Sequence, residues 1–127
     1  MLNNKGQSLV LFVLIIPILL GIMVLVMDVG NVIYYKQDID NINRLVIDYG
    51  LSHMDEENVL TDMKELAKLN NKDLSIEIVF NDMEFYVSSS YYVNGIFSSI
   101  FKMKGFNVKS KFKGYKEIDK NIIEKIN

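Results

Sequence analysis

The chain has 127 residues, enough for one domain with a single core of useful size. Sixteen acidic and fourteen basic residues give a net charge of −2, so bulk charge indicates no polyanionic partner. The lack of cysteine excludes disulfides and thiol nucleophiles, and one histidine leaves little for imidazole catalysis or a multi-histidine metal site. Because no residue set combines a nucleophile, a base and an orienting group, we expect no enzyme activity and no cofactor.

An apolar segment near the N-terminus is the main feature of the sequence. Residues 9–27 read LVLFVLIIPILLGIMVLVM and carry no charge. As a helix at 1.5 Å per residue the segment would be about 28 Å long, close to the roughly 30 Å hydrocarbon core of a bilayer. We therefore expect one transmembrane helix at 9–27, in contact with membrane lipid. A removed secretory signal and a buried core helix are the alternatives, although the residues after Met27 offer no small-x-small cleavage site.

Charge and proline add two expectations for this segment. Lys5 lies in a short leader at 1–8, which favours a cytoplasmic N-terminus and an extracytoplasmic domain at 28–127. Pro17 cannot donate to the carbonyl of the preceding turn, so a bend near mid-membrane is expected. The simpler interpretation is that proline is common in membrane helices.

A three-four repeat of apolar residues follows the transmembrane segment. It predicts that the helix continues outward as an amphipathic stem at 28–50, ending near Gly50. The repeat consists of Val32, Tyr35, Ile39, Ile42, Val46 and Tyr49. Such a stripe packs either on the protein's own sheet or in a coiled coil, and its short length favours the sheet.

A second helix is expected at 55–70. Asp55 is a suitable N-cap, and Glu56 and Glu57 suit the first turn because the helix dipole favours negative charge there. The expected inward face consists of Val59, Leu60, Met63, Leu66 and Ala67. His53 beside these glutamates falls short of a metal-ligand set, so we interpret the group as solvated surface.

Alternating apolar and polar residues predict an antiparallel sheet in the C-terminal half. Residues 74–80 and 83–93 both alternate, as half-buried strands do. A two-residue turn at Asn81-Asp82 would place every apolar side chain on one face of the hairpin. The pairs in that register are Phe80 with Met83, Ile78 with Phe85, and Ile76 with Val87.

Two further segments complete the expected α+β fold, which has a long N-terminal helix, a second helix and a small three-stranded sheet. Residues 96–101 have the apolar spacing of a short helical turn that would cover the sheet. A third strand follows, and its outer face carries what we name the lysine face: Lys109, Lys111 and Lys113.

Charge divides unevenly along the extracytoplasmic domain. Residues 28–84 hold thirteen acids and five bases, a net charge of −8, whereas residues 102–116 hold six lysines and no acid. The lysine face is either a solvated edge protected from aggregation or a contact for lipid headgroups or an acidic partner. Opposite patches could also meet between copies. No groove-reading motif is present, so no nucleic-acid partner is expected.

A set of motif positions runs through the first third of the chain: Gly6, Gln7, Phe12, Pro17, Asp28, Gly30 and Tyr34. Aligned on its glycine, the stretch at about 5–50 resembles the TadE/TadG-like family of pseudopilins from tight-adherence pilus systems. The family pattern has a Gly-Gln start, an apolar run opened by Glu-Phe, a proline within the run, and Asp-aromatic-Gly followed four residues later by tyrosine.

Two positions depart from the family pattern. Leu11 stands where prepilin-type substrates carry glutamate five residues after the processing glycine, and Val29 replaces the aromatic residue after Asp28. The family's buried glutamate is thought to pair with a neighbouring N-terminal amine, which leucine cannot do. The resemblance implies cleavage by a prepilin peptidase between Gly6 and Gln7, and the leucine argues against it.

The resemblance implies a pilin-like fold and a non-catalytic role as a minor pilin or pseudopilin. Such a protein would be part of a Tad-type pilus assembly or secretion apparatus, with other pilins or pilus-assembly membrane proteins as partners. The alternative is a membrane-anchored extracytoplasmic binding module whose lysine face recognises an acidic wall polymer, lipid or protein. Leu11 favours the binding module, whereas Asp28, Gly30 and Tyr34 favour the pseudopilin.

Overall fold

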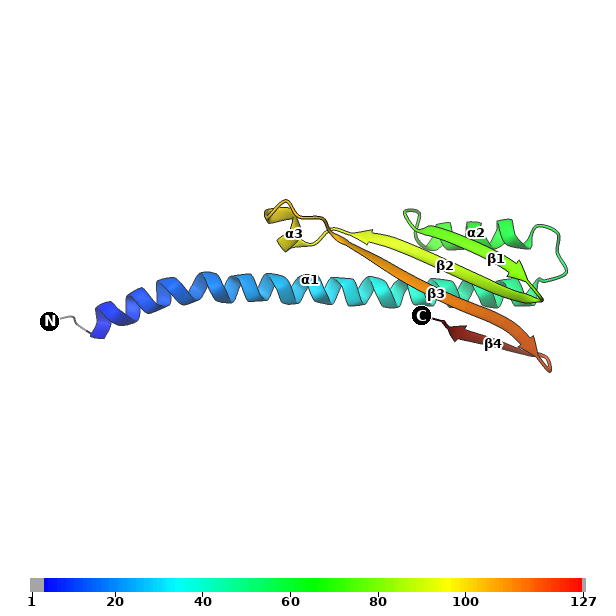
Figure 1. Cartoon of the computed structure of the whole chain (residues 1–127), viewed down its shortest axis with the longest axis horizontal. Helices are drawn as coiled ribbons and strands as arrows, with labels where there is room; N and C mark the ends of the chain where they lie inside the picture. The colour runs from blue at the N-terminus through cyan, green and yellow to red at the C-terminus, as the bar shows by residue number, and fades with distance from the viewer. Residues whose placement is uncertain (1–3, 127) are drawn as a thin grey trace.

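The molecule is elongated and is built along one long helix (Figure 1). This computed structural model describes residues 4–126, so residues 1–3 of the expected leader and residue 127 lie outside the described residues. In chain order the elements are α1 (Asn4–Ser52), α2 (Val59–Asn70), β1 (Ser75–Asn81), β2 (Glu84–Val93), α3 (Ile96–Ile100), β3 (Phe106–Glu117) and β4 (Lys120–Lys125). We call α2, α3, the sheet and the part of α1 packed on them the head. The expected α+β class, with a long N-terminal helix and a second helix, is confirmed.

The sheet has four antiparallel strands in the order β1-β2-β3-β4, so the expectation of three strands is wrong. The fourth strand pairs with β3 across a turn at Ile118 and Asp119, both at positive φ. Its apolar residues are two adjacent isoleucines, Ile122 and Ile123, between polar residues, and this pattern has no alternation that would predict a strand. β4 pairs with residues 112–117 of β3, so Lys113 has a neighbouring strand on both sides, whereas Lys109 precedes the paired part and has only the strand β2 beside it among the described residues. The edge-protection interpretation of the lysine face therefore stays a prediction.

The hairpin between β1 and β2 turns one residue later than expected. Its turn residues are Asp82 and Met83, at φ 51° and 64°, as a tight hairpin of the favoured handedness requires. The observed pairs are Ile78 with Val87, Phe80 with Phe85, and Asn81 with Glu84. The expected turn and register are therefore wrong: each residue of β1 pairs with a residue of β2 two positions later than expected. Met83, expected on the inward face, is instead an exposed turn residue. The inward sides of β1 and β2 were otherwise assigned correctly, because side chains in a strand repeat every two residues and a shift of two keeps them on the same side.

The connection between α1 and α2 is longer than the sequence indicated. Helix α1 continues to Ser52, past Gly50, and α2 begins at Val59 with Asn58 as N-cap, so the expected start at Asp55 is wrong. Residues 53–57 are needed to reverse the chain. Leu60 of the expected inward face is exposed, whereas the other four members are buried or partly buried.

The core lies between the sheet and the apolar stripe of α1, which confirms packing on the protein's own sheet. Ile39, Ile42 and Val46 of the stripe are buried, and Val32, Tyr35 and Tyr49 are partly buried against the same core. A close contact shows how tightly α1 lies on β3. A Cβ added at Gly114 would be 2.0 Å from Cγ2 of Ile47. Since full burial of a large apolar side chain contributes about 1.5–3 kcal/mol, this half of α1 is a principal source of head stability.

Candidate functional site

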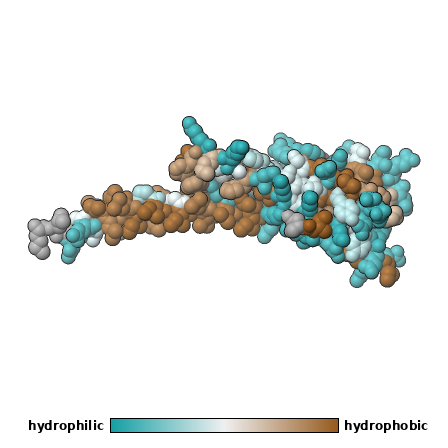
Figure 2. Space-filling model, viewed as in Figure 1, coloured by the Kyte–Doolittle hydropathy of each residue, from teal (hydrophilic) through white to brown (hydrophobic). Residues whose placement is uncertain are grey.

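The N-terminal half of α1 projects from the head with its apolar side chains exposed. None of residues 9–27 is buried, and Figure 2 shows this part of the molecule as an almost uniformly hydrophobic rod. Within residues 4–126, α1 is the one helix long and apolar enough to cross a membrane. Since none of residues 9–27 is buried, although the end of the segment lies beside α3, the alternative of a buried core helix is wrong. In length and composition the segment is compatible with a single-pass membrane protein.

The motif residues of this exposed half lie along an unbroken helix. Gly6, Gln7 and Leu11 line one shallow surface, and Phe12 is exposed. Pro17 lies inside α1 without ending it, and the N-terminal end of the helix is inclined to the rest (Figure 1).

Asp28 joins α1 to α3. Its carboxylate is 3% exposed and accepts hydrogen bonds from the backbone N–H of Ile96 at 2.7 Å and of Phe97 at 2.8 Å. These N–H groups belong to the first turn of α3 and have no partner within that helix. A Cβ added at Gly95 would lie 2.6 Å from Oδ2 of Asp28, so glycine permits this approach. Asp28 therefore caps a helix that lies far away in the sequence.

Gly30 and Tyr34 lie one turn apart on another face of α1, away from the Asp28 contact. No described atom lies within 4 Å of a Cβ added at Gly30. Tyr34 is 62% exposed and has an edge-to-face contact with Tyr35, with ring centroids 5.4 Å apart. Val29 and Ile33 are also exposed. We call Val29, Gly30, Ile33 and Tyr34 the stem face; it continues the apolar surface beyond residue 27.

The lysine face lies on the side of the sheet opposite α1 and α2. Lys113 is 3.7 Å from Glu124, whereas Lys109 and Lys111 form no ion pair within the described residues. The backbone oxygen of Lys109 accepts a hydrogen bond from Lys36 of α1. The sequence therefore assigned these three lysines to the correct side of their strand.

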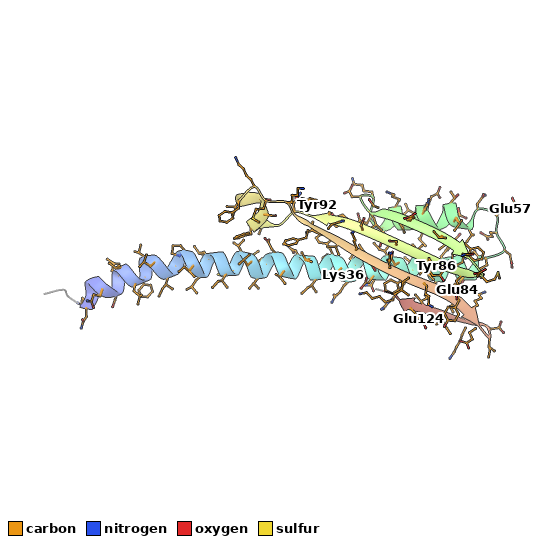
Figure 3. The ribbon with its side chains drawn as sticks, in the orientation of Figure 1. Lys36, Glu57, Glu84, Tyr86, Tyr92 and Glu124 are labelled. Atoms are coloured by element: carbon orange, nitrogen blue, oxygen red, sulfur yellow. The ribbon has the colours of Figure 1, made fainter. Side chains whose placement is uncertain are left out.

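Acidic and aromatic groups share the side of the sheet that carries the lysine face, and Figure 3 labels three of them, Glu84, Tyr86 and Glu124. The hydroxyl of Tyr86 donates to Glu84 at 2.5 Å, and this hydrogen bond raises the pKa of Tyr86 above its usual 10.0. A shallow hollow of about 250 Å³ has both Glu77 and Lys111 in its lining. This mixture of charges makes the surface a weaker anion site than a run of lysines would suggest.

A polar network between α1 and the sheet was missed by sequence reasoning. Asn43 of α1 donates to the backbone oxygen of Ser110 at 3.3 Å and accepts from the hydroxyl of Ser89 at 2.8 Å. Asp40 accepts from the Ser110 hydroxyl and lies 3.0 Å from the Lys125 ammonium. Every buried side-chain nitrogen and oxygen in the described residues has a partner, so the network fixes how α1 lies on β2, β3 and β4.

His53 has a local structural role. Its Nδ1 is 2.8 Å from the backbone oxygen of Tyr49. The imidazole ring also stacks on the Tyr49 ring, with ring centroids 4.1 Å apart. Burial, followed by the nearby Asp62 carboxylate, raises the pKa of Tyr49. Within residues 4–126, no group of three or more His, Asp or Glu side chains is arranged to hold a metal ion.

No protein-family model, curated protein or solved structure matches this chain. Its surfaces are therefore the basis for a functional argument. The two that stand out are the exposed apolar half of α1 with the stem face, and the mixed-charge outer face of the sheet.

Proposed function

We propose that the protein is a membrane-anchored structural subunit, a minor pilin or pseudopilin of a Tad-type pilus assembly or secretion apparatus, with no catalytic step. In this proposal residues 9–27 cross the cell membrane, the N-terminus is cytoplasmic and the head is extracytoplasmic. Partners are other pilins or pilus-assembly membrane proteins.

The observation that carries the proposal is the stem face. A bilayer would cover residues 9–27, but Val29, Gly30, Ile33 and Tyr34 follow that segment and pack on no part of the head. Large apolar side chains left together on a surface are typical of contact with another molecule. Gly30 would allow the backbone of a neighbouring helix to approach closely, as small residues do where membrane helices pack.

Assembly would proceed by lateral association of α1 helices in the membrane, followed by contact between heads. Leu11 places no carboxylate in the hydrocarbon, so the anchor is stable without a charged partner and association relies on apolar packing. Acidic residues of one head and lysines of another could supply the contact outside the membrane.

The alternative function, a binding module for an acidic wall polymer, lipid or protein, is favoured by one observation. Lys109 and Lys111 are exposed and form no ion pair within the described residues. Glu77 and Glu84 on the same face of the sheet weaken this alternative, because they repel an acidic ligand.

A single-cysteine crosslinking experiment tests assembly, because the natural chain contains no cysteine. Full-length Tyr34→Cys, expressed in membranes together with the candidate pilins, is expected to form disulfide-linked dimers or adducts with another single-cysteine pilin. Leu69→Cys is the matched control, since Leu69 is 84% exposed on α2, far from the stem face. Equal crosslinking of the two variants, or none at Tyr34→Cys, would refute the proposed assembly.

Mass measurement of the N-terminus tests prepilin processing separately. Co-expression with a prepilin peptidase decides between the family motif, which favours cleavage after Gly6, and Leu11, which argues against it. A mature chain that begins at Gln7, and that is lost in Gly6→Ala, would support processing. A chain that keeps Met1 under these conditions would exclude processing and leave an unprocessed anchor.

A further inference from the structure

The segment from α3 to the start of β3 exposes an unusual number of apolar side chains. We call residues 96–106 the interfacial loop. Its exposed apolar members are Ile96, Ile100, Phe101, Met103 and Phe106, each between 41% and 65% exposed. Lys102 and Lys104 are interleaved with them and are also exposed. A cluster of this kind on a small head indicates a surface that is covered in the working protein.

The interfacial loop lies beside the end of the apolar half of α1. Asp28, the first residue after the apolar segment, holds the N-terminus of α3 by its two hydrogen bonds. One turn further toward the N-terminus, Val24 is partly shielded, unlike its exposed neighbours Met23 and Leu25. Figures 1 and 2 show α3 alongside α1, with a hydrophobic surface that continues the hydrophobic rod.

Specific hydrogen bonds hold the loop in this position. The backbone N–H of Met103 donates to the backbone oxygen of Ser98 at 2.7 Å, and Gly95 N–H donates to the Ser98 hydroxyl at 3.0 Å. At the other end, Gly105 N–H donates to the Tyr92 hydroxyl at 2.6 Å; Figure 3 shows Tyr92 where the sheet meets α3. Backbone groups of the loop therefore bond within the head, while its large apolar side chains remain outside.

We propose that the interfacial loop is a second membrane contact, inserted into the interface of the leaflet from which α1 emerges. This inference rests on the proposed membrane anchor. Phe101 and its apolar neighbours would be buried at the boundary between headgroups and acyl chains, as the apolar face of an interfacial segment is. Lys102 and Lys104 can extend their ammonium groups to lipid phosphates while their methylene chains stay in the apolar layer.

A lipid surface suits the loop better than a second copy of the head. The loop lies at the level where the apolar segment of α1 ends, so a bilayer that covers this segment reaches the loop as well. Its charged members are lysines, which attract anionic headgroups, and residues 102–116 contain no acid.

A two-point contact would have a mechanical consequence. One transmembrane helix by itself leaves the head free to rotate about the helix axis, whereas side chains anchored at the interface restrict tilt and rotation. With the loop inserted, the stem face and the outer face of the sheet would each point in a fixed direction relative to the membrane. The head would be oriented before it meets a partner.

Single-tryptophan fluorescence tests this proposal, because the natural chain contains no tryptophan. Full-length Phe101→Trp is reconstituted in phosphatidylcholine–phosphatidylglycerol vesicles whose acyl chains carry bromine, a contact quencher. We expect loss of most of its fluorescence and protection from acrylamide. The matched water-exposed control is Ile118→Trp, at the turn between β3 and β4, where Ile118 is 94% exposed. Its fluorescence is expected to be quenched by acrylamide and not by bromolipid.

A third variant, Ile18→Trp, separates failure of the anchor from failure of the loop. Quenching by bromolipid at Ile18→Trp but not at Phe101→Trp would overturn the interfacial loop and leave the anchor intact. No quenching at either site would overturn the anchor and the loop together. Protection of Phe101→Trp from acrylamide without bromolipid quenching would show that protein covers the loop, which also overturns the proposal.

The lysines provide a second measurement on the same protein. Adding Lys102→Glu and Lys104→Glu to Phe101→Trp is expected to weaken bromolipid quenching in vesicles rich in phosphatidylglycerol more than in neutral vesicles. An equal loss of quenching in the two kinds of vesicle would show that the lysines do not bind anionic headgroups, and that part of the proposal would be wrong.

Discussion

The two halves of α1 show how one continuous helix can have two different surroundings. Residues 9–27 are apolar on every side, and none of them is buried by the protein. Further along, Ile39, Ile47 and Leu51 are completely buried, while polar residues occupy the other side of the helix. Both halves are helical, and the distribution of apolar residues around the axis distinguishes the half that lipid would cover from the half that packs on a sheet.

The largest expected effect comes from making the same substitution in both halves. Leu51→Ala should lower the free energy of unfolding of the head by about 2–5 kcal/mol, because it leaves a cavity in the core. Leu14→Ala should change it by less than about 0.5 kcal/mol, because Leu14 packs on no part of the head. Urea unfolding of the full chain in detergent micelles, followed by near-ultraviolet circular dichroism, measures both. Equal destabilisation would mean that the two halves unfold as one unit.

A pair of glycine substitutions sharpens the comparison between packed and free surfaces. Gly114→Ala should cost about 1–3 kcal/mol of head stability, because its new methyl group would collide with Ile47. Gly30→Ala should leave the head intact or stabilise it by up to about 1 kcal/mol, because alanine favours helix and the space around it is open.

The same unfolding measurement tests the glycine pair, with a crosslinking assay added for Gly30→Ala. If Gly30 serves helix association, Gly30→Ala in the Tyr34→Cys background should reduce crosslinking without loss of stability. The proposal that Gly30 is an assembly position would be wrong if crosslinking did not change. Ile47→Ala should relieve part of the cost of Gly114→Ala, which distinguishes a collision from backbone strain.

The smallest expected effect on global stability lies at the boundary between the halves. Asp28→Ala leaves two N–H groups of α3 without their acceptor, at a local cost of about 1–3 kcal/mol. Hydrogen exchange should therefore speed up in the peptide that contains Ile96 and Phe97, while strands β2 and β3 stay protected. Asp28→Asn keeps one acceptor oxygen and should give an intermediate rate. An unchanged exchange rate would show that Asp28 does not hold α3.

Sequence reasoning succeeded where a pattern is local and repeated. The spacing of Ile39, Ile42 and Val46 predicted a buried stripe, and the alternation in β1 and β2 predicted their inward faces despite the wrong turn. Sequence reasoning failed where the packing of distant elements overrode a local preference. Asp55 has the chemistry of an N-cap, but it lies in the chain reversal that α1 and α2 require.

The site was predictable only in part. Motif position Asp28 stood out in the sequence, but its contact with α3 lies 68 residues away and no local pattern encodes it. The lysine face was assigned to the outer side of its strand, whereas the covering of its Lys113 end by β4 could not be predicted. Residues 96–101 were expected to cover the sheet, yet Ile96, Ile100 and Phe101 are exposed, because spacing alone cannot show which way a short helix faces.

By itself, the sequence determined the apolar segment long enough to cross a membrane, the stripe on the stem and the alternation of the main strands. These properties depend on residues close together in the chain, through the repeats of helix and strand. Only the tertiary structure decided that Asp28 caps α3, that Asp40 and Asn43 bond to the sheet, and that the stem face stays free of the head. Those contacts join residues distant in sequence, so their partners are set by how the helix lies on the sheet.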